Sequence, residues 1–230
     1  MKCILVKLDL QVLIKKKKIV FVHIPKTAGS SIELSLKPHR DARQKIIRRI
    51  NKSLNSIGSK TQLESIYLNT HASAKDYAAY LGDDFKNYFS FAIVRNPFDR
   101  MVSHYHFEKR IYGDIPFKDY LMNRASLKNQ IDYLLGGDGK IAVSFIGRLD
   151  SLQRDFQFVS AAIGLNLELP HVNKTKHSHY SSTYDQETAD FLISHFERDF
   201  EAFGYEKSFS TSSTFLTDGA CGCQTSLMAS

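Results

Sequence analysis

The segment IVFVHIPKTAGSS, residues 19–31, places an apolar run directly before a short polar loop that contains a glycine. A continuous apolar run of this kind is typical of a strand buried on both faces, as in a parallel sheet. Ile32, Leu34 and Leu36 follow the loop and begin a helical pattern. The sequence therefore predicts a strand, a tight loop and a helix, and this unit favours an α/β fold.

A second apolar run, at residues 88–94, also ends in polar residues. Asn96 and Pro97 then suit the N-cap and first turn of a helix. Elsewhere the patterns predict a loop at residues 170–182, a short strand at 141–145, and helices at 73–81, 151–163 and 186–200. Together these elements predict a P-loop-like, three-layer α/β fold with a mostly parallel central sheet and helices on both faces. In such sheets the ligand lies at the carboxyl ends of the strands.

The chain length of 230 residues suits one domain, which we expect to span residues 1–205. Residues 206–230 are rich in serine and threonine and have little apolar periodicity, which predicts a disordered or weakly packed tail. Cys3, Cys221 and Cys223 make no disulfide framework. The Cys-x-Cys pair lacks two further ligands at suitable spacing, so no metal site is predicted.

The apolar stretch at residues 2–14 is interrupted by Lys7 and Asp9. It is too short to span a bilayer and lacks the small-residue cleavage site of a signal peptide. Its alternation of polar and apolar residues predicts a strand instead. We therefore expect a soluble, cytoplasmic protein without stable membrane insertion.

Basic residues give the chain a formal charge of +7, so an anionic partner is expected. They gather at Lys15–Lys18 and in residues 37–52. The second stretch carries apolar residues at helical spacing, which predicts either a solvated amphipathic helix or an acceptor-binding patch. Aromatic residues of the kind that bind single-stranded nucleic acid are not interleaved there, so no nucleic-acid partner is expected.

The loop after the first strand has the composition of a phosphate site. Small residues let backbone N–H groups approach an anion, and the start of a helix adds partial positive charge. Lys26 supplies a full charge, and Thr27, Ser30 and Ser31 supply hydroxyl groups. The lysine precedes the glycine, whereas a Walker A lysine stands at the helix start, so the order argues against an ordinary ATPase or GTPase. The alternative, a turn without a ligand, requires neither the lysine nor three hydroxyl groups.

Arg95 stands at the end of the second predicted strand. A guanidinium group there needs an anionic partner, which its planar fork suits whether the partner is a carboxylate or a phosphate. The partner is either a bound anion or Asp99, four residues further along the chain. Ser103 adds a hydroxyl donor on the following helix.

These segments resemble the donor motifs of carbohydrate sulfotransferases. IVFVHIPKTAGSS is similar to their 5′-phosphosulfate-binding loop. FAIVRNPFDRMVSHYHF, residues 91–107, is similar to their 3′-phosphate-binding segment, with Arg95 and Ser103 at the family's Arg-x₇-Ser positions. The resemblance extends over residues 19–205 and includes Gln130 and the segments 144–152, 169–180 and 199–205. The family comprises Golgi enzymes that sulfate heparan, chondroitin and dermatan chains, together with soluble bacterial relatives. The membrane anchor and cysteine framework of the Golgi members are not seen in this sequence.

The resemblance implies a sulfotransferase that moves a sulfuryl group from 3′-phosphoadenosine 5′-phosphosulfate (PAPS) to a hydroxyl acceptor, a saccharide by analogy, without a metal. Lys26 would contact the oxygen that bridges phosphate and sulfuryl group. Five residues of the loop would bind the 5′-phosphate: Thr27, Ala28, Gly29, Ser30 and Ser31. Arg95 and Ser103 would hold the 3′-phosphate, and Lys174 and Thr175 would close over the nucleotide.

A hydroxyl acceptor also needs a group that takes its proton near neutral pH, and histidine suits this role. His71 matches the position at which related enzymes carry their candidate base, just before the second donor strand. His104 and His106 follow Arg95 on the helix, and His23, on the first strand, is expected to be structural. The histidines at positions 171, 177 and 179 lie in the late loop and are alternatives for contact with acceptor or donor.

Two other functions compete with sulfuryl transfer. A non-catalytic binder of anionic glycans or nucleotides on the same fold would use the basic stretches, and an atypical P-loop kinase would use the phosphate loop. The place of Lys26 in the loop and the presence of Arg95 argue against the kinase. The same residues, together with a candidate base, favour an enzyme over a binder.

Overall fold

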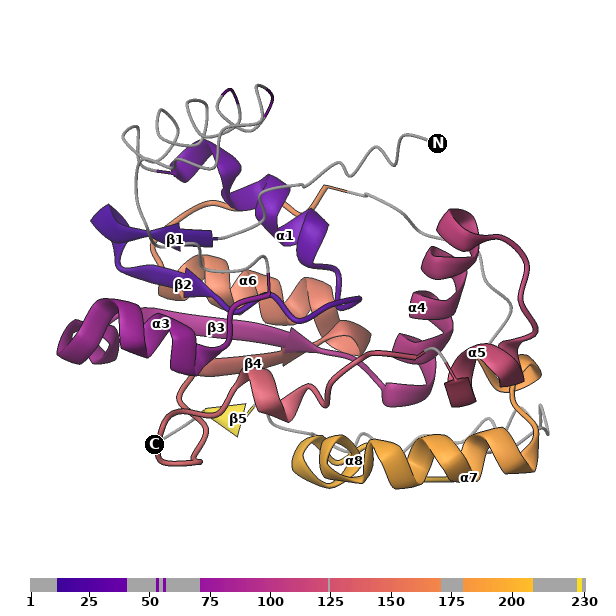
Figure 1. Ribbon diagram of the computed structural model, residues 1–230. Helices are drawn as coiled ribbons and strands as arrows, with labels where there is room; N and C mark the ends of the chain where they lie inside the picture. The colour runs from indigo at the N-terminus through magenta and orange to yellow at the C-terminus, as the bar shows by residue number, and fades with distance from the viewer. Residues whose placement is uncertain are drawn as a thin grey trace, which may run out of the picture.

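A computed structural model describes residues 12–40, 53, 56, 71–123, 125–170, 180–208, 227 and 228 of the chain. Its strands form one sheet of five in the order β1-β2-β3-β4-β5 (Figure 1). They are β1 (Val12–Ile14), β2 (Ile19–Phe21), β3 (Phe89–Val94), β4 (Phe145–Arg148) and β5 (Leu227–Met228).

The three central strands run parallel, and the two edge strands run antiparallel to their neighbours. A short 3-10 turn, η1 (Lys15–Lys17), joins β1 to β2 and carries most of the lysine run. The parallel pairing of β2, β3 and β4 brings their carboxyl ends to the same edge of the sheet. The predicted α/β fold with a mostly parallel sheet is therefore confirmed.

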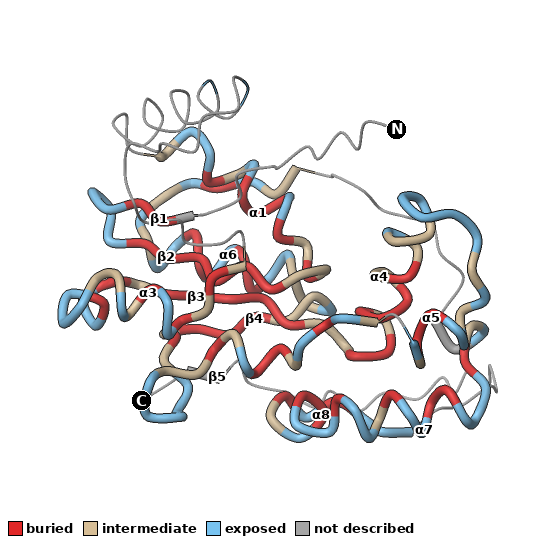
Figure 2. Tube along the Cα trace, viewed as in Figure 1, coloured by how far each residue is buried: buried red, intermediate tan, exposed pale blue. Residues whose placement is uncertain are grey.

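Alternate residues of the central strands face opposite sides of the sheet, and each side carries its own core. One core joins Phe21 and Ile93 to the helices α1 (Gly29–Leu36) and α6 (Leu152–Ala162). The other joins Val20 and Val94 to five helices: α3 (Ala74–Leu81), α4 (Pro97–Tyr112), α5 (Phe117–Asn123), α7 (Gln186–His195) and α8 (Glu197–Phe203). Figure 2 shows the central strands as the buried middle layer between these helices.

The predicted strand at 141–145 is wrong in its position, because β4 begins only at Phe145. Ile141 forms an isolated bridge with Leu135, across a turn in which Gly139 has a φ of 76°. The predicted helix at 186–200 is two helices, since α7 ends at His195 and α8 begins at Glu197. Helix α5 was not predicted.

Several predicted features fall outside the described residues: the strand at 2–11, most of the basic stretch at 37–52, most of the loop at 170–182, and both Cys221 and Cys223. Among the residues that are described, none of the helices has both the length and the apolar character needed to cross a membrane.

Candidate functional site

The loop between β2 and α1 has an unusual backbone. Lys26 and Ala28 both adopt left-handed conformations, with φ of 70° and 65°. Ala28 is also the N-cap of α1 and offers no side-chain hydrogen bond to the first turn of the helix. Successive backbone N–H groups in such turns form concave anion sites, and a helix start adds partial positive charge.

Side chains hold three consecutive carbonyl groups of this loop. The Thr27 hydroxyl donates to the carbonyl of Ile24 at 2.9 Å. Nε of Arg100 donates to Pro25 at 3.0 Å, and Nη1 of Arg95 donates to Lys26 at 3.0 Å. These bonds fix the carbonyl groups of the loop, and the Ser31 N–H donates within the loop to the carbonyl of Ala28 at 3.0 Å. The N–H groups that precede Ser31 are therefore the backbone donors to consider for a bound anion.

The three hydroxyl groups of the loop differ in their exposure and therefore in their access to a bound anion. Thr27 is fully buried and its hydroxyl is used inside the loop, so its contribution to an anion would come from the backbone N–H. Ser30 is exposed, and Ser31 is buried beside a groove that the loop borders.

Lys26 projects toward α4, where its Nζ lies 4.3 Å from the centre of the Phe107 ring. The guanidinium carbon of Arg110 lies 5.8 Å from the same ring. Burial, followed by repulsion from Arg110 and Arg95, lowers the pKa of Lys26 to about 8. Because burial and like charges disfavour the charged form of Lys26, a bound anion would stabilise that charged form strongly.

Arg95 follows β3 directly and its Nε donates to Oδ2 of Asp99 at 2.7 Å. The interpretation of Asp99 as its partner is therefore confirmed, and the bond to Lys26 shows a second role in anchoring the phosphate loop. Ser103 is partly exposed and stands four residues after Asp99 on α4, hence on the same side of the helix.

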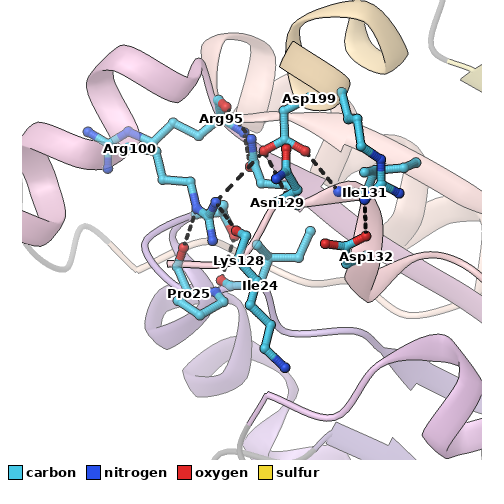
Figure 3. A network of polar contacts seen from close by, with 12 residues as sticks. Ile24, Pro25, Arg95, Arg100, Lys128, Asn129, Ile131, Asp132 and Asp199 are labelled. Atoms are coloured by element: carbon cyan, nitrogen blue, oxygen red, sulfur yellow. Dashed lines mark hydrogen bonds and ion pairs between the residues drawn. The ribbon is translucent and has the colours of Figure 1, made fainter. Parts of the chain in front are cut away.

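Gln130, which is fully buried, fixes the backbone of Arg95 from both sides. Its Oε1 accepts from the Arg95 N–H at 2.9 Å and its Nε2 donates to the Arg95 carbonyl at 2.8 Å. Asp199 in turn accepts from the N–H groups of Gln130 at 2.8 Å and Ile131 at 3.0 Å. A residue of α8 therefore supports the loop that positions Arg95 (Figure 3).

Arg100 completes this network and was not identified from the sequence. It is 1% exposed and bonds to the carbonyls of Pro25 and Lys128, while its Nη1 lies 3.9 Å from Oδ2 of Asp199 (Figure 3). The available signal was an arginine between the apolar residues Phe98 and Met101 of a predicted helix. Such a buried cation requires acceptors, and the loop after β2 provides one of them, while Nη2 is buried without a hydrogen-bond partner among the described residues.

His71 lies two residues before the N-cap of α3, next to the end of β2. Its Nδ1 is 3.0 Å from the backbone carbonyl of His23. Because a carbonyl only accepts, Nδ1 carries the proton and Nε2 is left with the lone pair. Burial lowers the pKa of His71 to about 4, and the ring is therefore neutral at pH 7.

His104 is a second candidate base, and it lies close enough to Lys26 to feel its charge. Its Nδ1 is hydrogen-bonded to the Tyr120 hydroxyl, and burial together with Lys26 lowers its pKa to about 4. His23 is buried, in keeping with a structural role. The histidines at 171, 177 and 179, as well as Lys174 and Thr175, lie outside the described residues.

A groove of about 1630 Å³ begins at the phosphate loop and runs along α6. Ala28 and Ser31 form one end, and Leu149 and the segment 164–170 form much of the remaining wall. The groove combines leucine side chains with polar groups from α6, as ligand pockets commonly do.

A family model described as the sulfotransferase family matches residues 11–206, which is most of the chain and includes the phosphate loop, Arg95 and Asp199. No curated protein and no solved structure matches the chain.

Proposed function

Since this chain belongs to the sulfotransferase family and is therefore a sulfuryl-transferring enzyme, we propose that it takes the sulfuryl group from PAPS and gives it to a hydroxyl group of a saccharide. The observation that supports the proposal is the bond between Arg95 and the carbonyl of Lys26, which joins the two segments that we propose as anion sites at one edge of the sheet. A donor with separate 3′- and 5′-phosphate groups requires two such segments at close range.

The phosphate loop would bind the 5′-phosphosulfate. Backbone N–H groups of residues 27–30 and the Ser30 and Ser31 hydroxyls would supply donors, and Lys26 would supply the charge at the bridging oxygen. Backbone groups held in advance need no reorganisation during the reaction, which is the source of their strength in a transition state.

Arg95 and Ser103 would bind the 3′-phosphate. The 2.7 Å bond to Asp99 leaves the guanidinium fork with further N–H groups for an anion. The adenosine would occupy the groove beside Ala28, with leucines against the base and polar groups of α6 at its edges. Lys174 and Thr175 complete this proposal as residues that close over the nucleotide.

The transfer itself exchanges one sulfur–oxygen bond for another. The acceptor oxygen attacks sulfur in line with the bond to the bridging oxygen, and that bond breaks to release 3′-phosphoadenosine 5′-phosphate (PAP). The hydroxyl proton passes to Nε2 of His71, which its neutral state leaves free to accept it. Lys26 neutralises the charge that develops on the bridging oxygen, and no metal is assigned a part.

A saccharide is proposed as acceptor because the two donor segments resemble those of carbohydrate sulfotransferases. The formal charge of +7 also suits an acceptor that carries negative groups.

The direct test is calorimetric titration with PAP and with its isomer ADP. Clear binding of PAP with little binding of ADP supports the donor assignment. Equal or tighter binding of ADP overturns it and favours a kinase. Transfer from radiolabelled PAPS to a panel of saccharides then tests the acceptor, and binding of PAP without transfer to any of them favours a non-catalytic binder.

Two lysine variants test the role of Lys26 in transfer. Lys26→Met should abolish transfer, whereas Lys16→Met should not, because η1 precedes β2 and lies at the opposite end of that strand from Lys26. Near-normal turnover in Lys26→Met would remove Lys26 from the mechanism.

A further inference from the structure

The phosphate loop contains a glycine whose place is set by a neighbouring side chain. A Cβ atom added to Gly29 would lie 1.9 Å from Nε2 and 2.1 Å from Cδ2 of His23. Gly29 is not among the glycines with positive φ, so its backbone conformation is open to other residues. Glycine is therefore required at this position because the imidazole ring of His23 occupies the space that a Cβ atom would need.

The His23 ring has little freedom to move away. It is 6% exposed, and its Nδ1 lies 3.4 Å from Oε1 of Glu33, which is itself 2% exposed. The Phe21 ring stacks against it with centroids 5.7 Å apart. On another side the His71 ring meets it edge to face at 4.7 Å.

His23 thus contacts both halves of the proposed site. Its ring lies against the first residue of α1, at the start of the helix that follows the phosphate loop. Its carbonyl accepts the hydrogen bond that fixes the protonation of His71, and its ring packs against the His71 ring.

We infer that His23 is a positioning residue that sets the phosphate loop through Gly29 and the proton acceptor through His71. The inference deepens the proposed function and its catalytic part rests on that function. The steric part does not, because the contact between His23 and Gly29 exists in the free protein.

A double-variant cycle on the free protein tests the steric part. Gly29→Ala should lower the urea midpoint of unfolding, since the new methyl group meets a ring that cannot move. His23→Ala removes the ring, so Gly29→Ala should cost much less in that background. Equal shifts in both backgrounds would overturn the coupling.

His23→Phe provides the matched control. Phenylalanine keeps a ring beside Gly29, so Gly29→Ala should remain costly in that background. If Gly29→Ala became less costly in the His23→Phe background as well as in the His23→Ala background, the clash with the ring would not be the cause of the destabilisation. If His23→Ala leaves Glu33 too poorly paired for folding, Glu33→Gln in every member of the cycle removes that buried charge.

The catalytic part is tested by separating binding from turnover. Gly29→Ala should weaken PAP binding about 10- to 100-fold, the range for loss of one hydrogen bond to a charged group, because the loop must move away from the His23 ring. The double variant with His23→Ala should recover most of that affinity but keep a low kcat, because His71 has lost its packing partner. Recovery of both quantities, or of neither, contradicts the assignment.

NMR of the His71 ring supplies a direct readout of this packing. The wild-type ring should show the proton on Nδ1, and His23→Ala should keep it there, because the backbone carbonyl of residue 23 that accepts it remains. The ring-proton shifts of His71 should change instead, because the edge-to-face contact with the His23 ring is lost. Unchanged ring-proton shifts in His23→Ala would overturn the link to His71. A wild-type protein that does not bind PAP would count against the proposed function, while the unfolding cycle would still decide the contact with Gly29.

Discussion

Nη1 of Arg95 donates a hydrogen bond of 3.0 Å to the backbone carbonyl of Lys26. The residue assigned to the 3′-phosphate thus also holds the left-handed residue of the loop assigned to the 5′-phosphate. Substitution of Arg95 should therefore affect both ends of the donor, although unequally.

Arg95→Ala should weaken binding of PAP about 10- to 100-fold, the range for loss of a hydrogen bond to a charged group. Adenosine 5′-phosphate, which lacks only the 3′-phosphate, should lose a smaller factor that reports the loosened loop. Calorimetry with both nucleotides measures the two losses. Equal losses of affinity for the two nucleotides would show that Arg95 does not bind the 3′-phosphate.

The pKa of Lys26, about 8, predicts a pH dependence of donor binding. The protonated lysine attracts the anion, so affinity for PAP should be highest below pH 8 and fall by up to about tenfold per pH unit above it. Arg110→Gln removes a like charge and should move the fall to higher pH. In Lys26→Met the fall should disappear, and its persistence there would assign it to another group.

The low pKa of His71, about 4, predicts that the base stays neutral through the range in which an ordinary histidine titrates. Turnover should therefore show no loss centred near pH 6.5, the usual value for histidine. His71→Ala should lower kcat by about 10²- to 10⁴-fold with little change in the affinity for PAP. A larger effect on affinity than on kcat would mark His71 as a binding residue, and an intact kcat would direct attention to His104.

The buried contacts of Asp199 predict a large effect on stability. Asp199→Ala leaves Arg100 without its carboxylate and two N–H groups without an acceptor, at a cost of about 3–5 kcal/mol. The matched control is Arg198→Ala on the same helix, which breaks an exposed ion pair with Asp132 and should cost less than about 1 kcal/mol. Urea unfolding measures both, and similar costs would show that the network does not hold the loop.

If the adenosine binds in the groove along α6, a large side chain placed in that groove should block its binding. Ala161 lines the groove, and Ala161→Trp should weaken binding of PAP while leaving that of inorganic pyrophosphate unchanged. Ala162→Trp is the matched control, because Ala162 is its exposed neighbour on α6 and is not among the lining residues. Equal effects of the two variants on PAP would place the nucleoside elsewhere.

Much of the site was predictable because it depends on residues that are close in the sequence. The run from Ile19 to Ser31 encodes a strand, a loop and a helix start, and Asn96 caps α4 as its position before Pro97 predicts. The sequence also offered Asp99 as one of two partners for Arg95, and the structure shows that bond between the residue after β3 and the first turn of α4. Lys26, Arg95 and the α/β fold could therefore be identified from the sequence alone.

The tertiary structure decided how these parts hold one another. Arg100 and Asp199 are ninety-nine residues apart, yet Arg100 holds the loop that carries Pro25, and Asp199 holds Gln130, which fixes the backbone of Arg95. The reason for Gly29 is likewise a contact with His23 across the turn, not a backbone conformation. The same holds for the pKa of His71, because burial that lowers it comes from packing that no local pattern specifies. Sequence thus determined which chemical groups are present, and packing determined which of them are held in place and which are neutral.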